Sequence, residues 1–389
     1  MRVLVISHLY PSAVSHSSGS FVMSQVQRLR THAEVQVASP VPWWPVPLGG
    51  RWGRLARLPR ADQAGGMAVD RPRYLGLPRR WLFGRAGGSM ARAVGLAVTR
   101  RPDVVHGHCA YHDGHAAVSL ARRWGVPAVV TVHGYDLHDL AVAGSRWRPL
   151  VVAALAAADR VIGVSRELCR RVADLGIDAA RITHVPNGVD MELFQPATVA
   201  RDPASPWRLV YVGRLEPAKG IDELLQSVRW LRDQGRQVRA ELVGGGEPAR
   251  ARAYATRARQ LGIDGQVAFV GEVPQSQVAV HLAAADLLVL PSHSEGMPLS
   301  VIEALACGLP VVATACGGLP EIVDEMVGRL VAPGDAVALG QAIAAVLEGY
   351  GRYDRAAIRA RTVERYDWRR VAERLIEVYR DVVAARSGA

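Results

Sequence analysis

The feature that most constrains the fold of this chain is a regular alternation of short Val- and Ile-rich runs with longer helical patterns. Such alternation is typical of β/α units built on a parallel sheet. In the first half we expect strands at residues 3–7, 34–39, 103–108, 127–133 and 160–165. The pattern restarts after the Pro-rich segment "PASPW" at 203–207 and predicts six more strands. The sequence therefore predicts an α/β fold.

The chain has 389 residues, which is more than one hydrophobic core usually fills. We expect two Rossmann-like domains, 1–200 and 201–367, that face a central cleft. The last helical pattern, 368–389, has apolar residues at helical spacing, which allows packing on either domain; we expect the N-terminal one. Residues 40–90 mix Pro, Gly, Trp and Arg, so we expect an irregular stretch over a site or a surface.

Positive charge is concentrated in residues 51–101, which contain twelve arginines and only Asp62 and Asp70 as acids. This segment carries +10 of the net charge of +11. It favours an anionic partner, whether a membrane surface, a phosphorylated substrate or nucleic acid, and Trp43 and Trp44 lie just before it. The alternative is a solvated face in an arginine-rich chain. We expect no nucleic-acid partner.

The four cysteines, Cys109, Cys169, Cys307 and Cys316, are far apart in the sequence. This spacing suggests neither a zinc knuckle nor a disulfide framework, and it fits a reducing compartment. The first apolar run is too short for a signal peptide, and no apolar stretch reaches the ~18 residues that a membrane span needs. We expect a cytoplasmic protein that is a candidate for peripheral contact with the inner face of the membrane.

Lys219 is the only lysine among the 47 basic residues and lies in "GRLEPAKG", 213–220. This segment follows the first expected strand of the second domain, where β-to-α loops of parallel sheets bind ligands. Arg214 in the same loop offers a planar fork to phosphate oxygens, whereas lysine offers a compact charge.

A second informative segment, "SHSEGMPLSVIEALACGLPVVAT", begins at Ser292 and contains Glu295 and Glu303. We expect a helix that begins at Pro298 and stops before Gly308. The amino end of that helix suits a phosphate or sugar hydroxyls, and a carboxylate inside it can accept both hydroxyls of a ribose. The alternative is one loop charge and one helix surface charge.

These motifs give the chain a family resemblance. The E-x7-E pair with "EALACGLPVVAT", "GGLPEIV", "VPNGVD" and "GRLEPAKG" resembles the retaining glycosyltransferases of family 4, which have the GT-B fold. The resemblance covers nearly the whole chain and is strongest over 184–335. It implies a hexosyltransferase that moves a sugar from a UDP- or GDP-linked donor to a hydroxyl of a glycan, lipid-linked or small-molecule acceptor. It implies a role in polysaccharide biosynthesis and no metal or other cofactor.

The resemblance also implies roles for particular residues. Arg214 and Lys219 would stabilise the leaving diphosphate, Glu295 would lie beside the donor sugar, and Glu303 would bind the ribose. His133 would lie near the transferred sugar. Further donor contacts would come from Gly19, Gly213, Gly244, Glu272, Val273, Gly296, Met297, Pro298 and Leu299. Asp136, Asn187 and His108 would line the acceptor site or the cleft.

Three alternatives stay open at this point. A sugar-nucleotide epimerase shares the GT-B fold. A metal-dependent hydrolase would use the H-x-H element His106 and His108, with further ligands such as Asp136 or His133. The segment "GGGEPA", 244–249, fits a dinucleotide-binding pattern, although the match is short. The sequence chooses neither the donor base and sugar nor the acceptor.

Overall fold

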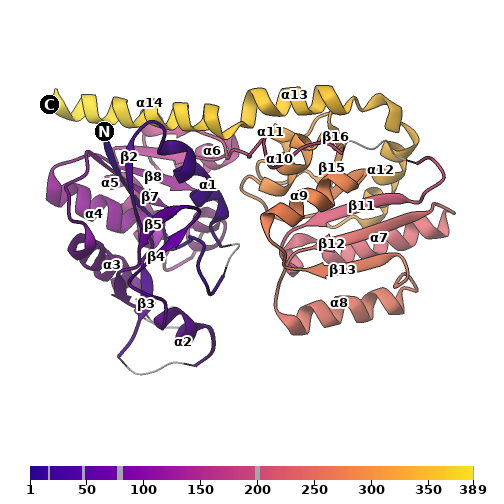
Figure 1. Cartoon of the computed structure of the whole chain (residues 1–389), viewed down its shortest axis with the longest axis horizontal. Helices are drawn as coiled ribbons and strands as arrows, with labels where there is room; N and C mark the ends of the chain where they lie inside the picture. The colour runs from indigo at the N-terminus through magenta and orange to yellow at the C-terminus, as the bar shows by residue number, and fades with distance from the viewer. Residues whose placement is uncertain (16–17, 46–48, 77–81, 198–201, 389) are drawn as a thin grey trace. The chain divides into compact units, whose positions relative to one another are not determined.

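A computed structural model describes residues 1–15, 18–45, 49–76, 82–197 and 202–388. The chain divides into two compact units (Figure 1). Unit 1 contains Met1–Asn187 together with Trp368–Ala389, and unit 2 contains Gly188–Asp367. Each unit is a Rossmann-like arrangement of a largely parallel sheet and covering helices. The α/β prediction is therefore confirmed.

Within its described residues, unit 1 has an eight-stranded sheet in the order β10-β9-β8-β7-β1-β2-β5-β4. Its strands are β1 (Arg2–Ile6), β2 (Glu34–Ala38), β4 (Ala61–Ala64), β5 (Met67–Asp70), β7 (Val104–His108), β8 (Ala128–Val132), β9 (Arg160–Gly163) and β10 (Ile182–His184). All pairings are parallel except that of β4 with β5. The five strands expected in the first half are all present.

Helices cover both faces of this sheet because its central strand is apolar on both sides. Val3 and Val5 of β1 belong to a core with α1 and α14, whereas Leu4 and Ile6 belong to a core with α3 and α4. The helices of unit 1 are α1 (Ser20–Leu29), α2 (Gly50–Ala56), α3 (Phe83–Ala97), α4 (His115–Trp124), α5 (Arg148–Ala157), α6 (Arg166–Asp174) and α14 (Trp368–Ser387).

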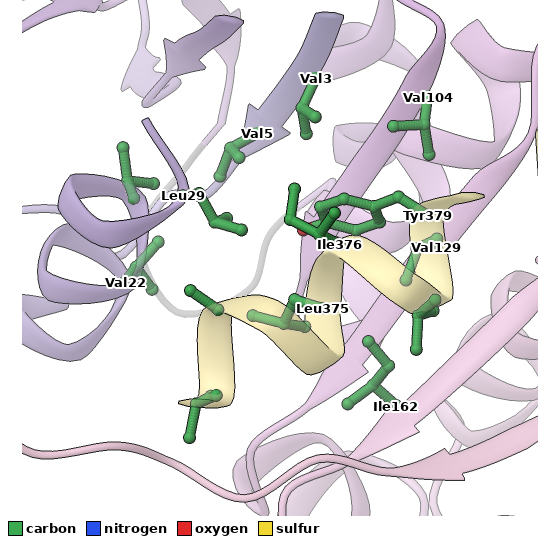
Figure 2. Close-up of a cluster of buried hydrophobic side chains, with 14 of the residues drawn as sticks. Val3, Val5, Val22, Leu29, Val104, Val129, Ile162, Leu375, Ile376 and Tyr379 are labelled. Atoms are coloured by element: carbon green, nitrogen blue, oxygen red, sulfur yellow. The ribbon is translucent and has the colours of Figure 1, made fainter. Parts of the chain in front are cut away.

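The C-terminal helix α14 supplies much of one core of unit 1. It places Leu375, Ile376 and Tyr379 among side chains of β1, β7, β8 and β9, such as Ile162 (Figure 2). Tyr379 is fully buried, and its hydroxyl lies 2.7 Å from Nδ1 of His106. The C-terminal helix of the sequence thus completes a hydrophobic core of the N-terminal unit.

The prediction of an irregular stretch at 40–90 is wrong for the part that the structure describes. Strands β3 (Val41–Trp43) and β6 (Arg73–Leu75) pair in parallel, and β4 and β5 form a hairpin. Gly65 and Gly66 turn this hairpin with positive φ angles, which suits glycine. These strands are only three or four residues long, and β3 contains Pro and β6 contains Arg, so each is too short a pattern to predict a strand from the sequence. Residues 46–48 and 77–81 lie outside the described residues.

Unit 2 has a six-stranded parallel sheet in its described residues, in the order β13-β12-β11-β14-β15-β16. The strands are β11 (Trp207–Val212), β12 (Val238–Val243), β13 (Val267–Gly271), β14 (Leu287–Leu290), β15 (Val311–Thr314) and β16 (Gly328–Val331). All six are the strands expected from the sequence. The helices are α7 (Ile221–Asp233), α8 (Pro248–Gln260), α9 (Gln275–Ala284), α10 (Leu299–Ala306), α11 (Leu319–Ile322), α12 (Ala336–Glu348) and α13 (Arg355–Tyr366). This is the doubly wound order.

The boundary between the units lies at Asn187–Gly188 and not at residue 200. Val189 donates a backbone hydrogen bond of 2.8 Å to the carbonyl of Tyr366, and Phe194 is fully buried. Arg359 of α13 donates to the carbonyl of Phe194 at 2.6 Å and to that of Met191 at 2.9 Å. The described segment 188–197 is therefore part of unit 2.

Replacing Leu375 by Ala is expected to destabilise unit 1 by about 2–5 kcal/mol, because it removes a buried side chain of α14 and leaves a cavity. Chemical denaturation measures the change. Glu377→Ala is the matched control, because Glu377 is exposed on the same helix. Equal stability of the two variants would contradict a structural role for α14.

Candidate active site

In unit 2 the strand order reverses between β11 and β14, and open parallel sheets bind ligands at the carboxyl ends of strands at such a point. The loops that follow these strands hold each other closely. The amide of His293 donates to the carbonyl of Ala218 at 2.9 Å. Gly220 has a φ of +67°, and a Cβ there would lie 2.0 Å from the carbonyl oxygen of Pro291. Only glycine allows this approach.

The two loops place Lys219 against Glu295. Nζ of Lys219 lies 2.7 Å from Oε1 of Glu295, and the two side chains are 19% and 9% exposed. Oγ of Ser292 donates to the same carboxylate oxygen at 2.6 Å. Arg214 points elsewhere: its side chain is 71% exposed and pairs with Glu216 at 2.9 Å. The structure thus joins two of the predicted residues and leaves Arg214 largely in solvent.

The loop that carries Glu295 is fixed by the loop after β15. Thr314 Oγ1 and, at 3.2 Å, Cys316 Sγ donate to the carbonyl of Ser292. A Cβ on Gly317 would lie 1.8 Å from the carbonyl oxygen of Glu295. The amide of Gly318 donates to the carbonyl of Gly296 at 3.1 Å. These contacts set the backbone of the segment predicted to approach the donor.

Helix α10 follows this loop. Pro298 is its N-cap and Leu299 its first residue, so the expected start at Pro298 is one residue early. No side chain caps the helix, whose first-turn N–H groups are the kind that bind anions. Met297 before the cap is buried, and Gly308 after the helix has a φ of +71°.

Glu303 lies inside α10 and is 7% exposed. Nε2 of Gln275, at the start of α9, donates to Oε1 of Glu303 at 3.1 Å. Burial raises the pKa of the Glu303 carboxyl to about 7, and the hydrogen bond from Gln275 opposes that rise. A buried carboxyl with one protein donor is suited to accept hydrogen bonds from ligand hydroxyls.

The glycine loops after β11, β12 and β13 also meet. Gly244 has a φ of +141°, and a Cβ there would lie 1.9 Å from the carbonyl oxygen of Gly213. A Cβ on Gly245 would lie 2.9 Å from Oε2 of Glu272, which precedes Val273 in the loop after β13. The predicted donor residues of unit 2 therefore lie in the loops at the carboxyl edge of its sheet and in helix α10, which follows one of these loops.

Unit 1 gathers the remaining predicted residues at the carboxyl edge of its own sheet. Nδ1 of His108, at the end of β7, lies 3.0 Å from Nε2 of His133, which follows β8. The two rings stack with an interplanar angle of 12°, and the ring centroid of Phe21 lies 4.6 Å from that of His133. Burial lowers the pKa of His133 to about 3, so this ring is neutral. Asp136 is buried and accepts from the backbone amide of Ala110 at 2.7 Å.

Two further predicted residues lie in unit 1. Gly19 precedes α1 with a φ of +71°, and a Cβ there would lie 2.1 Å from the carbonyl oxygen of Leu9. It therefore holds the loop after β1 against the start of α1. Asn187 is buried and is the last residue of the first segment of unit 1.

The chain shares sequence with known proteins over most of its length. Residues 19–193 match glycosyltransferase family 4, and residues 199–363 match the glycosyl transferases group 1. The chain is 32% identical over 359 residues to glycosyltransferase TuaC, assigned to teichuronic acid biosynthesis in Bacillus subtilis, with 88% of each chain covered. The chain belongs to glycosyltransferase family 4.

A further relative and two solved structures are also similar to this chain. The chain is 33% identical to a D-inositol 3-phosphate glycosyltransferase of Xylanimonas cellulosilytica, with 73% of each chain covered. A sucrose-phosphate synthase of Thermosynechococcus elongatus superposes with a TM-score of 0.83 at 26% identity, covering 99% of this chain and 100% of that one. Anabaena HepE in complex with UDP-glucose has the same fold, with a TM-score of 0.73, 19% identity and coverage of 98% and 100%. The GT-B prediction is confirmed, and the protein is a glycosyltransferase of class EC 2.4.

The contacts of His106 argue against the metal-hydrolase alternative for this glycosyltransferase. Its Nδ1 bonds to Tyr379 and its Nε2 to Thr131, both at 2.7 Å, so neither nitrogen is available as a ligand. The described ranges contain no group of three His, Cys, Asp or Glu side chains that could hold a metal ion. In the part of the chain that the structure covers, no helix combines the length and apolar character that a membrane span requires.

Four residues of these sites were not predicted from the sequence. Ser292 and Gln275 hold the two glutamates, and each follows a predicted strand. His8 and Asp113 bond at 2.7 Å in unit 1. Their positions in the sequence could have indicated them. His8 follows β1 and Asp113 follows β7, and the strand order reverses between these two strands.

Replacing Glu303 by Gln is expected to stabilise the folded enzyme at about pH 8, because a neutral amide replaces a buried carboxylate. Between the ordinary pKa of 4.5 and about 7, the folded protein keeps a proton that the unfolded chain releases. The stability from Glu303 is therefore present at low pH and falls as the pH rises through this window. The expected gain is at most about 3 kcal/mol above the window and near zero below it.

Urea denaturation at about pH 4 and pH 8 measures this difference. Glu364→Gln removes an exposed carboxylate from α13 and is the matched control. A gain that is equal at both pH values, or equal in the control, would contradict a raised pKa for Glu303.

Proposed function

We propose that this glycosyltransferase transfers a hexose, with retention, from a nucleoside diphosphate sugar to an acceptor hydroxyl, and that it does so without a metal ion. The observation that carries the proposal is the Lys219–Glu295 pair at the order reversal of unit 2. A cation and a carboxylate held in loops at this position suit a leaving diphosphate and a sugar respectively.

The polar side chains of the candidate site in unit 2 have separate roles in the proposed reaction. Glu303 accepts the ribose hydroxyls, and Gln275 orients it. Departure of the diphosphate builds negative charge on a phosphate oxygen, and the Lys219 ammonium stabilises that charge because it is already in place. Arg214, with its exposed guanidinium, is available to turn onto the second phosphate.

The stereochemistry follows from the role of Glu295. Its carboxylate is held by Lys219 and Ser292, and both bonds reduce its nucleophilicity. Glu295 therefore orients the sugar and stabilises positive charge on the ring instead of forming a covalent intermediate. The acceptor oxygen attacks the face from which the diphosphate leaves, and the leaving phosphate takes the hydroxyl proton. His133 lies beside the sugar, with His108 fixing its ring.

Wild-type enzyme is expected to hydrolyse one member of a panel of UDP- and GDP-sugars slowly in the absence of acceptor. UDP-glucose, the ligand of HepE, is the first donor to test. Lys219→Ala is expected to lower kcat by about 100-fold, because the leaving group loses its cation. Lys219→Arg is also expected to be slower, since a guanidinium is larger and needs two aligned acceptors. Release of nucleoside diphosphate is the measurement.

Arg252→Ala, which removes an exposed cation from α8, is the control for loss of charge. Circular dichroism checks that each variant is folded. Normal turnover by Lys219→Ala would show that the site is misassigned. An inverted product, or a trapped sugar on Glu295, would rule out the stereochemical part of the proposal.

The name of the Bacillus subtilis relative, which assigns it to teichuronic acid biosynthesis, supports a role in polysaccharide biosynthesis. Unit 1 supports membrane contact through exposed arginines and apolar side chains near α2 and β3. Arg54 and Arg57 are exposed, and Trp43 and Leu75 are 39% and 45% exposed. Not all arginines of 51–101 contribute, because Arg73 donates to backbone carbonyls at the end of α2.

The enzyme is expected to sediment with vesicles that contain phosphatidylglycerol and to remain in solution with phosphatidylcholine alone, since the binding is electrostatic. Replacing Arg54 and Arg57 by Ser should release it. The matched control replaces Arg100 and Arg101, which are exposed after α3. Equal release by both double variants would indicate a general charge effect and contradict a docking surface at α2.

A further inference from the structure

Three histidine rings lie in a row near the carboxyl edge of the sheet of unit 1. His106 and His108 belong to β7, and His133 follows β8. The ring centroids of His106 and His108 are 4.3 Å apart, and those of His108 and His133 are 5.2 Å apart. Burial lowers the pKa of His106 and of His133 to about 3 and that of His108 well below its usual range. All three rings are therefore neutral, and each carries one proton on one nitrogen.

The first ring of the row is held at both nitrogens. Nδ1 of His106 lies 2.7 Å from the hydroxyl of Tyr379 in α14, and Nε2 lies 2.7 Å from Oγ1 of Thr131 in β8. His106 therefore has a partner for each nitrogen within unit 1, and it meets His108 through ring contact alone.

The second and third rings share one hydrogen bond, between Nδ1 of His108 and Nε2 of His133 at 3.0 Å. Two neutral rings carry two protons on four nitrogens, and this bond takes one of the protons. The other proton lies on the outer nitrogen of the accepting ring. That atom is Nδ1 of His133 if His108 donates, and Nε2 of His108 if His133 donates. Both atoms are buried, and neither has a hydrogen-bond partner among the residues that the structure describes.

The surroundings decide which ring carries this unpaired N–H group. His108 is fully buried inside unit 1, where an N–H group on Nε2 would stay unpaired at a high cost. His133 is half-buried, borders Phe21 at the start of α1, and lies in a loop at the edge where parallel sheets bind ligands. A bound ligand can accept a hydrogen bond from this ring. The arrangement in which His108 donates to His133 is therefore favoured.

We propose, on the basis of the glycosyltransferase function above, that His108 is a positioning residue that donates to Nε2 of His133 and so keeps the His133 proton on Nδ1. His133 then meets the nucleotide sugar as a neutral hydrogen-bond donor to an oxygen atom. In this form neither nitrogen of His133 has a free lone pair, so His133 is not the base that takes the proton of the acceptor hydroxyl. That role stays with the leaving phosphate.

The first experiment reads the tautomers directly, without substrate. Long-range proton–nitrogen NMR spectra of the full chain, with isotope label in its twelve histidines, distinguish a protonated ring nitrogen from one with a lone pair. Loss of signals in His108→Asn and His133→Gln assigns the two rings. Both rings are expected to carry the proton on Nδ1 and the lone pair on Nε2. A proton on Nε2 of His133 would overturn the proposal.

The second experiment measures hydrolysis of the nucleotide sugar that the wild-type enzyme cleaves. His108→Phe keeps a ring against His133 but removes the hydrogen-bond donor. Part of the His133 population should then move its proton to Nε2, and kcat/KM should fall about tenfold, as expected for one hydrogen bond. His108→Asn keeps an N–H group near the place of Nδ1, so it should retain the tautomer of His133 and most of kcat/KM.

Tyr379→Phe is the matched control, because it removes a buried hydrogen bond of the same row from His106 and not from His133. It should lower stability without changing the His133 tautomer or kcat/KM. Equal losses of kcat/KM in His108→Phe and Tyr379→Phe, or no loss in His108→Phe, would also overturn the proposal, since a structural role of the row would then suffice.

The wild-type spectra decide the tautomer even if a variant does not fold. They also separate this proposal from the function on which it rests. If the wild-type enzyme cleaves no UDP- or GDP-sugar but His133 carries its proton on Nδ1, the function proposed above fails and the role of His108 in fixing the tautomer stands.

Discussion

At the order reversal of each sheet, a carboxylate from one loop holds a basic group from the other. In unit 2, Glu295 after β14 holds Lys219 after β11, and in unit 1, Asp113 after β7 holds His8 after β1. All four groups lie where parallel strands present their carboxyl ends. A buried carboxylate without a partner is strongly disfavoured, so each pair fixes the loops that carry it. The candidate active site in unit 2 and the loops at the carboxyl edge of unit 1 both depend on these pairs.

Close backbone approaches support the pair in unit 2. Gly220 and Gly317 allow carbonyl oxygens to come so near that a Cβ would overlap with them. The backbones of the loops around Lys219 and Glu295 therefore pack directly against each other and against the loop after β15. Glu303 is held differently, because its carboxyl is buried and, among the described residues, accepts its hydrogen bond from the neutral amide of Gln275 and not from a cation. That difference fits a group whose remaining partners come from a ligand.

The features of the fold that depend on a local sequence pattern could be predicted from the sequence. The Val- and Ile-rich strands of both sheets and the helix between Glu295 and Gly308 follow from residue spacing. The pair of His8 and Asp113 does not, because 105 residues separate them and only the strand order brings them together. Strands β3 and β6 escaped prediction because three residues are too few for an alternating pattern. The boundary at Asn187 depends on bonds to α13, which no local signal indicates.

The choice of lysine at position 219 follows from the same contacts. In an arginine-rich chain, an arginine here would offer Glu295 two parallel bonds and would be held by the carboxylate. An ammonium gives Glu295 one bond of 2.7 Å and keeps two donors that can turn toward another anion. In the proposed reaction, one cation can then bind both Glu295 and the leaving phosphate. The ability to bind two anions at once gives a physical reason for a single lysine among 46 arginines.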